Sequence, residues 1–139
     1  MTEAKPLRVL IADDEPLAAE RLQLLLARID SAQLVGTASD GESAINLATA
    51  LNPDVLLLDI AMPGLDGIGV ARSLAALDPS PAVVFVTAFD QFAVAAFEVE
   101  AVDYLMKPVD PARLHRALER ARAHLGSRSV ERKPERESK

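Results

Sequence analysis

Acidic side chains follow two apolar segments of this sequence, and their placement indicates an acidic pocket with a reactive carboxylate. Residues 55–58 are all apolar and precede Asp59, and residues 7–12 precede Asp13 and Asp14. Short apolar runs of this kind are typical of strands buried on both faces of a parallel sheet. Ligands of such sheets bind at the carboxyl ends of the strands. We therefore interpret Asp59 as the reactive centre of a crowded carboxylate pocket.

The elements that must position these acids alternate along the chain between strand-like runs and segments of helical period. Strands are expected at residues 7–12, 34–38, 55–58, 82–87 and 101–106, and helices at 16–29, 41–51, 67–77, 92–98 and 110–126. Pro16 fits a first helical turn, Asp40 a helix N-cap and Gly126 a helix end. The alternation predicts an α/β fold, a doubly wound five-stranded parallel sheet with five helices.

Composition narrows the class of protein. The chain has 139 residues, half of them hydrophobic, and contains no cysteine, which fits one globular domain without disulfides or thiolate metal sites. Its net charge of −6 disfavours nucleic-acid binding by this domain alone. Without a signal peptide or long apolar run, we expect a cytoplasmic protein with no membrane span. Residues 127–139 are charged and nearly devoid of apolar side chains, so we expect a flexible linker or tail after a domain of residues 1–126.

Thr87 and Lys107 follow two further strands, and with the acids they form a set that resembles the receiver domain of two-component response regulators. The resemblance covers about residues 6–126 and implies a CheY-like, flavodoxin-like fold. It makes Asp59 the phosphoacceptor of a sensor histidine kinase, Thr87 the switch hydroxyl and Lys107 the lysine that contacts the phosphoryl group. It implies a signalling protein that catalyses only its own phosphotransfer and slow autodephosphorylation, not an enzyme in the usual sense.

Phosphoryl transfer to an aspartate needs positive charge around the phosphoryl oxygens. Three carboxylates about 4 Å apart repel by about 4 kcal/mol per pair at an effective dielectric of 20, so the pocket calls for a divalent cation. Oxygen ligands favour Mg²⁺. The ligands that the resemblance implies are Asp14, Asp59, the backbone carbonyl of Ala61 and, through water, Asp13. We interpret Glu15 first as an acid that interacts favourably with the helix dipole at the N-terminus of the first helix, and only second as additional charge in the pocket.

Tyr104 lies at the position of the family's switch aromatic residue, whose ring turns inward when the threonine moves toward the phosphoryl group. The alternative interpretation is a half-buried tyrosine of a strand. The bond between Lys107 and Pro108 is commonly cis in the family, which would aim the lysine into the pocket.

The segments 87–93 and 96–105 resemble the receivers that are joined to LytTR-type DNA-binding domains. No output domain follows Gly126, so we expect either a truncated regulator that reaches DNA through a missing domain or a stand-alone receiver. Phosphorylation is expected to favour a homodimer through the helix of residues 92–98, the strand of Tyr104 and the last helix.

Two other classes of protein share some of these features. A haloacid-dehalogenase-like, Mg²⁺-dependent aspartyl-phosphate phosphatase carries a second aspartate two residues after its nucleophile, where this chain has Ala61. A flavodoxin-like cofactor binder needs a phosphate-binding loop after the first strand, where the acids of residues 13–15 would repel phosphate. Leu17 and Leu24, seven residues apart on the first helix, either form an apolar docking strip for a kinase or pack against the neighbouring helix.

Overall fold

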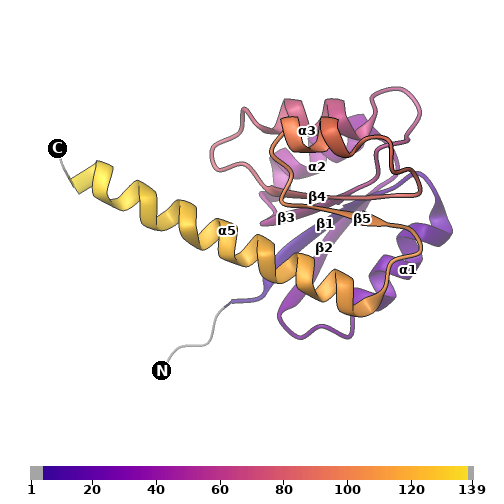
Figure 1. Cartoon of the computed structure of the whole chain (residues 1–139), viewed down its shortest axis with the longest axis horizontal. Coiled ribbons are helices and arrows are strands. Elements are labelled where there is room, and N and C mark those ends of the chain that lie inside the picture. The colour runs from indigo at the N-terminus through magenta and orange to yellow at the C-terminus, as the bar shows by residue number, and fades with distance from the viewer. Residues whose placement is uncertain (1–4, 138–139) are drawn as a thin grey trace.

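The fold is a single parallel sheet of five strands in the order β2-β1-β3-β4-β5, with helices on both faces (Figure 1). The computed structural model describes residues 5–137, with side chains through residue 128. The strands are β1 (Leu7–Ala12), β2 (Ala32–Ala38), β3 (Val55–Leu58), β4 (Ala82–Thr87) and β5 (Asp103–Met106). The helices are α1 (Pro16–Leu26), α2 (Gly41–Leu51), α3 (Gly67–Leu74), α4 (Ala93–Glu98) and α5 (Pro111–Glu137). This confirms the predicted fold class.

Side chains of the central strands alternate between two cores. Val9 and Ile11 of β1 pack with α1 and α5, whereas Leu10 and Ala12 pack with α2, α3 and α4 on the other face. Every residue of β3 and β4 is buried. This two-sided burial explains why the central strands read as continuous apolar runs.

Local signals in the sequence set the starts of several helices. Pro16 occupies the first turn of α1, where its missing N–H costs nothing. Asp40 caps α2 by accepting a hydrogen bond from the backbone of Ser43 at 2.7 Å, as its position predicted. Asp66 caps α3 in the same way, through the backbone N–H of Gly69. These caps satisfy backbone N–H groups in the first turns of α2 and α3.

Two helices end earlier than the apolar periodicity predicted. α1 ends at Leu26 and not at Ile29, because Arg28 and Ile29 bond to carbonyls only three residues back, which tightens the last turn. α3 ends at Leu74 and not at Leu77 for the same reason. Ile29 still packs against the core, so its apolar side chain reflects its burial and does not show that it belongs to the helix.

The last helix continues past Gly126 to Glu137, so the prediction that Gly126 ends it was wrong. Gly126 does not adopt the left-handed conformation of a helix-ending glycine; among the glycines of the described chain, Gly64 alone has a positive φ. A glycine inside a helix costs about 1 kcal/mol relative to alanine, which is too little to stop the helix. Arg128, beyond Gly126, donates a hydrogen bond to the backbone carbonyl of Ser80. In Figure 1 the end of α5 extends away from the sheet.

β5 is tied to α5 by a partly buried ion pair. Asp103, at the start of β5, accepts two hydrogen bonds from the guanidinium of Arg113, each at 2.8 Å. Burial alone would raise the pKa of Asp103, but the hydrogen bonds from Arg113 and from the backbone N–H of Tyr104, with the charges of Arg113 and Arg120, together hold that pKa below its usual value. The strand that precedes Lys107 is thereby attached to α5.

No helix within residues 5–137, the part that the structure describes, is long and apolar enough to cross a membrane.

Candidate functional site

The carboxyl ends of β1 and β3 bring three aspartates together, as the sequence predicted. The backbone N–H of Asp59 donates to the carbonyl of Ala12 at 2.9 Å, so the residues after the two strands lie side by side. Asp13, Asp14 and Asp59 each offer a carboxylate oxygen within 4.8 Å of the others. A cluster of hard oxygen atoms of this size can hold a divalent cation.

The carboxylate of Asp13 is almost fully buried, at 3% exposure. Its Oδ1 accepts a hydrogen bond from the backbone N–H of Glu15 at 2.9 Å. Its Oδ2 has no hydrogen bond of good geometry, although the ammonium of Lys107 lies 2.9 Å away. Leaving a buried carboxylate oxygen without a hydrogen bond is costly. The ammonium of Lys107 offsets the charge of this oxygen, and the oxygen's remaining lone pairs are suited to a further cation or an ordered water.

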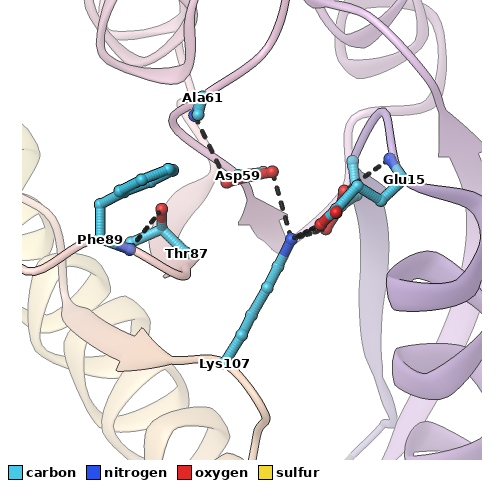
Figure 2. Close-up of polar contacts among 7 residues, drawn as sticks. Glu15, Asp59, Ala61, Thr87, Phe89 and Lys107 are labelled. Atoms are coloured by element: carbon cyan, nitrogen blue, oxygen red, sulfur yellow. Dashed lines mark hydrogen bonds and ion pairs between the residues drawn. The ribbon is translucent and has the colours of Figure 1, made fainter.

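Lys107 reaches into the acidic cluster from the end of β5 (Figure 2). Its Nζ lies 2.9 Å from Asp13 Oδ2, 2.8 Å from Glu15 Oε1 and 3.2 Å from Asp59 Oδ2. Its backbone N–H donates to the carbonyl of Thr87 at 2.8 Å, which anchors it to β4. Its bond to Pro108 is cis, as the family resemblance implied.

Glu15 contacts Lys107 directly, so the interpretation that put the helix dipole first missed its main partner. It lies at the N-cap of α1 and has no capping hydrogen bond from its side chain. The hydrogen bond to Lys107 lowers the pKa of Glu15. The three consecutive acids at residues 13–15 indicated concentrated negative charge at this site, but they did not identify Lys107, 92 residues from Glu15, as the partner.

The electrostatics of the cluster are coupled. Burial raises the pKa of Asp59; the nearby charge of Asp13 adds to this, while Lys107 opposes it. Burial by itself would lower the pKa of Lys107, but its close contacts with the carboxylates of Asp13 and Glu15, with the charge of Asp59, raise that pKa above the usual lysine value. Lys107 is therefore charged at neutral pH.

Thr87 ends β4 and is fully buried. Its Oγ1 accepts a hydrogen bond from the backbone N–H of Phe89 at 3.4 Å. In the view of Figure 2, Thr87 lies on one side of Asp59 and the ammonium of Lys107 lies on the other. The hydroxyl hydrogen is left available for an acceptor in the pocket.

Tyr104 is linked to the same loop as Thr87. Its hydroxyl donates a hydrogen bond to the backbone carbonyl of Phe89, and its ring lies 6.4 Å from the ring of Phe85. Burial raises the pKa of its hydroxyl. The peptide backbone of Phe89 thus connects the hydroxyls of Thr87 and Tyr104. The switch role of Tyr104 stays a prediction.

The loop after β3 folds back tightly over Asp59. The backbone N–H of Ala61 donates to Asp59 Oδ1 at 3.4 Å, and that of Gly67 donates to the carbonyl of Ile60 at 2.9 Å. A Cβ atom at Gly67 would lie 2.2 Å from the backbone oxygen of Asp59, so only glycine fits here. The loop places Ala61 beside the carboxylate, and the role of its carbonyl as a metal ligand stays a prediction.

A doubly wound sheet with an acidic pocket and a lysine at its carboxyl edge defines the class of protein, and sequence comparison identifies the same class. The family model for the response regulator receiver domain matches residues 9–119. The chain therefore belongs to the receiver domain family of response regulators.

The curated relatives of the chain agree with this family assignment. The chain is 51% identical over 116 residues to the positive alginate biosynthesis regulatory protein of Pseudomonas aeruginosa, covering 83% of this chain and 47% of that protein. It is 43% identical over 114 residues to the sensory transduction protein LytT of Bacillus subtilis, covering 82% and 47%. These relatives agree with the resemblance to LytTR-type receivers. The chain spans about half the length of the curated relatives it matches.

Solved structures show the same fold. The response regulatory domain of mrkE from Klebsiella pneumoniae superposes with a TM-score of 0.79 at 32% identity, covering 86% of this chain and 98% of that one. The isolated REC domain of RcsB from Salmonella enterica serovar Typhimurium, in the presence of phosphomimetic BeF3⁻, gives 0.75 at 28%, covering 83% and 87%.

Proposed function

We propose that this receiver domain accepts a phosphoryl group on Asp59 from a sensor histidine kinase and transmits that event to an output. The observation that carries the proposal is the contact of Lys107 Nζ with Asp59 Oδ2 at 3.2 Å, beside two further aspartates. Phosphoryl transfer requires a positioned nucleophile and nearby positive charge that can stabilise the phosphoryl oxygens.

The residues present fit a magnesium ion. Their donors are carboxylate oxygens, and one of them, Asp13 Oδ2, is buried without a hydrogen bond. Asp14, Asp59 and the carbonyl of Ala61 would hold Mg²⁺ directly, with Asp13 acting through water. The bound ion would offset the charge of the phosphoryl oxygens.

The side chains of this chain perform the transfer around Asp59. A carboxylate oxygen of Asp59 attacks phosphorus in line, forming an acyl phosphate as the bond from phosphorus to the histidine nitrogen of the kinase breaks. Lys107 exchanges part of its contact with the carboxylates for a phosphoryl oxygen, and the hydroxyl of Thr87 donates to another. The deep burial of Thr87 limits the directions in which this hydroxyl can point.

The bonds at Phe89 support a route from the pocket to the surface. When the Thr87 hydroxyl moves toward the phosphoryl group, it loses its hydrogen bond from the backbone N–H of Phe89. The carbonyl of Phe89 accepts the hydrogen bond from the Tyr104 hydroxyl. The neighbouring helix α4 has only six residues and exposes Val94 and, at 83%, Phe97. We propose that phosphorylation rearranges this region and favours a homodimer through α4, β5 and α5, because exposed apolar side chains are suited to a subunit contact. Sedimentation velocity with a phosphoryl mimic and Mg²⁺ should show dimers; an unchanged monomer at high micromolar concentration would exclude this mechanism.

The output is proposed to lie outside this chain. Residues 1–126 form the receiver in this proposal, and residues 127–139 lead to an output domain of the LytTR DNA-binding type, which would carry DNA binding and transcriptional control. The relatives' greater length and the continuation of α5 past Gly126 support it. A stand-alone receiver is the alternative. We propose that the phosphotransfer takes place in the cytoplasm.

Incorporation of phosphate, measured by intact-mass spectrometry, tests the proposal. With Mg²⁺ and a small acyl phosphate, the protein should gain one phosphoryl group, and Asp59→Asn should gain none at that site. A fully labelled Asp59→Asn variant would contradict the assignment of Asp59 as the phosphoacceptor. The alternative, an aspartyl-phosphate phosphatase, would release donor phosphate continuously without a lasting adduct; Ala61 stands where that class needs an acid/base aspartate.

A further inference from the structure

Helix α1 contacts the segment that carries Lys107 at two points. The carboxylate of Glu15, at the start of the helix, lies 2.8 Å from Lys107 Nζ. The guanidinium of Arg21, in the middle of the helix, donates a hydrogen bond of 2.7 Å from Nη2 to the backbone carbonyl of Val109. The first contact holds the tip of the lysine, and the second holds the main chain two residues beyond it.

The short loop between β5 and α5 determines where Lys107 points. On one side, the backbone N–H of Lys107 is fixed to the carbonyl of Thr87. Pro108 has no N–H and adds no such bond. On the other side, α5 begins at Pro111. The hydrogen bond from Arg21 to Val109 therefore lies at the part of the loop where the main chain is free of the sheet and has not yet entered the helix.

The packing between this loop and α1 is not continuous. A groove of about 410 Å³ lies between them and is lined mainly by the apolar side chains of Leu17, Ala18, Leu22, Val86, Ala88 and Pro108. Arg21 and Lys107 also line it. Val109 and Leu22 line the groove and belong to the same buried core, and Arg21 joins α1 to the loop across the groove.

We propose that Arg21 is a positioning residue for Lys107. By holding the carbonyl of Val109, its guanidinium keeps the loop against α1 and so keeps the ammonium of Lys107 in contact with Asp59. A hydrogen bond from a charged donor is stronger than one between neutral groups, which suits this task. The proposal rests on the function proposed above, because it concerns the rate at which Asp59 is phosphorylated.

The first test measures the rate of Asp59 labelling by a small acyl phosphate with Mg²⁺. Arg21→Ala should label roughly tenfold more slowly, less than the ~100-fold that a 1 Å misplacement of a reacting group can cost. Arg21→Lys keeps a cationic donor on α1 and should recover much of the lost rate. Arg28→Ala removes an exposed arginine just beyond the end of α1 and should label like the wild type. A wild-type rate for Arg21→Ala overturns the proposal.

A double-mutant cycle separates positioning from a general structural effect. If Arg21 acts through Lys107, then Arg21→Ala should lower the rate little or not at all in a Lys107→Ala background. An equal loss in both backgrounds overturns the proposal, because it would mean misfolding or direct contact of Arg21 with the donor. If Arg21 contacted the donor directly, Arg21→Ala would also raise the donor concentration needed for the half-maximal rate.

Hydrogen exchange provides a measurement that does not depend on phosphorylation. Arg21→Ala should speed exchange of the Lys107 amide, which is bonded to the carbonyl of Thr87, while the amides of β1 keep their protection. Unchanged exchange in the loop overturns the proposal even if no donor labels the protein. Accelerated exchange in a protein whose Asp59 is never labelled would support the positioning of Lys107 while contradicting the proposed function.

Discussion

Replacing Lys107 by methionine should destabilise the unmodified protein, because the charge that compensates Asp13 and Asp59 is removed. Methionine keeps much of the apolar stem and removes only the ammonium group. The Lys107 side chain is 14% exposed, and its two aspartate partners are almost fully buried. Breaking a buried ion pair costs about 3–5 kcal/mol. The contact with the exposed Glu15 adds little.

We expect a loss near the lower end of this range, about 3 kcal/mol in the free energy of unfolding, since some solvent reaches the lysine. A chain of this size loses about 2–4 °C in melting temperature per kcal/mol, so the midpoint should fall by roughly 6–12 °C. Because the fold raises the pKa of Lys107, its stabilisation is complete below the ordinary lysine pKa of about 10.4 and is lost as the pH rises through the folded value. The difference between variant and wild type should therefore persist at neutral pH and shrink in alkali.

Magnesium should then stabilise Lys107→Met more than it stabilises the wild type, because the lysine and the ion neutralise the same carboxylates. If the dissociation constant falls tenfold in the variant, the added stabilisation at saturating Mg²⁺ is about 1.4 kcal/mol. Thermal and urea unfolding with and without Mg²⁺ measure both effects. Lys5→Met, which removes an exposed lysine, is the control and should melt like the wild type. A Lys107→Met variant with wild-type stability and a wild-type response to Mg²⁺ would refute the reasoning.

Three further outcomes are expected. Because the fold raises the pKa of Asp59, its ionisation opposes folding; Asp59→Asn should be more stable than the wild type to urea at pH 7, with the gain vanishing below the ordinary aspartate pKa of ~3.9. A less stable variant at pH 7 would contradict this. Asp14→Ala should abolish the rise in melting temperature with Mg²⁺, worth ~2.7 kcal/mol at a hundredfold excess over Kd; an equal rise would place the ion elsewhere. Leu24→Glu, at a position 63% exposed on α1, should slow transfer from a cognate kinase and spare labelling by a small donor, whereas an equal loss would indicate misfolding.

The sequence was sufficient for features that depend on local pattern. The two-sided burial of β3 and β4 was visible in their apolar runs, and the cap at Asp40 in its position before α2. The assembly of the aspartates followed from the rule that parallel strands end at one edge. The course of α5 past Gly126 was not predictable in this way, because a glycine is tolerated in a helix when no turn conformation is required.

Contacts between distant segments could not be read from the sequence. Glu15 and Lys107 are 92 residues apart, and Arg21 and Val109 are 88 apart. Neither pair has a periodic or local signature. Their proximity depends on where α1 packs relative to the loop after β5, which is set by the tertiary packing of both elements on one face of the sheet.

A structure of the protein with Mg²⁺ and a beryllium fluoride phosphoryl mimic tests the central claim most directly. We expect the mimic on Asp59, the ion held by Asp14, Asp59 and the carbonyl of Ala61, and the mimic's remaining atoms in contact with Lys107 Nζ and Thr87 Oγ1. A mimic bound to another residue, or an ion held away from Asp14 and Asp59, would contradict the assignment of this pocket as the phosphoacceptor site.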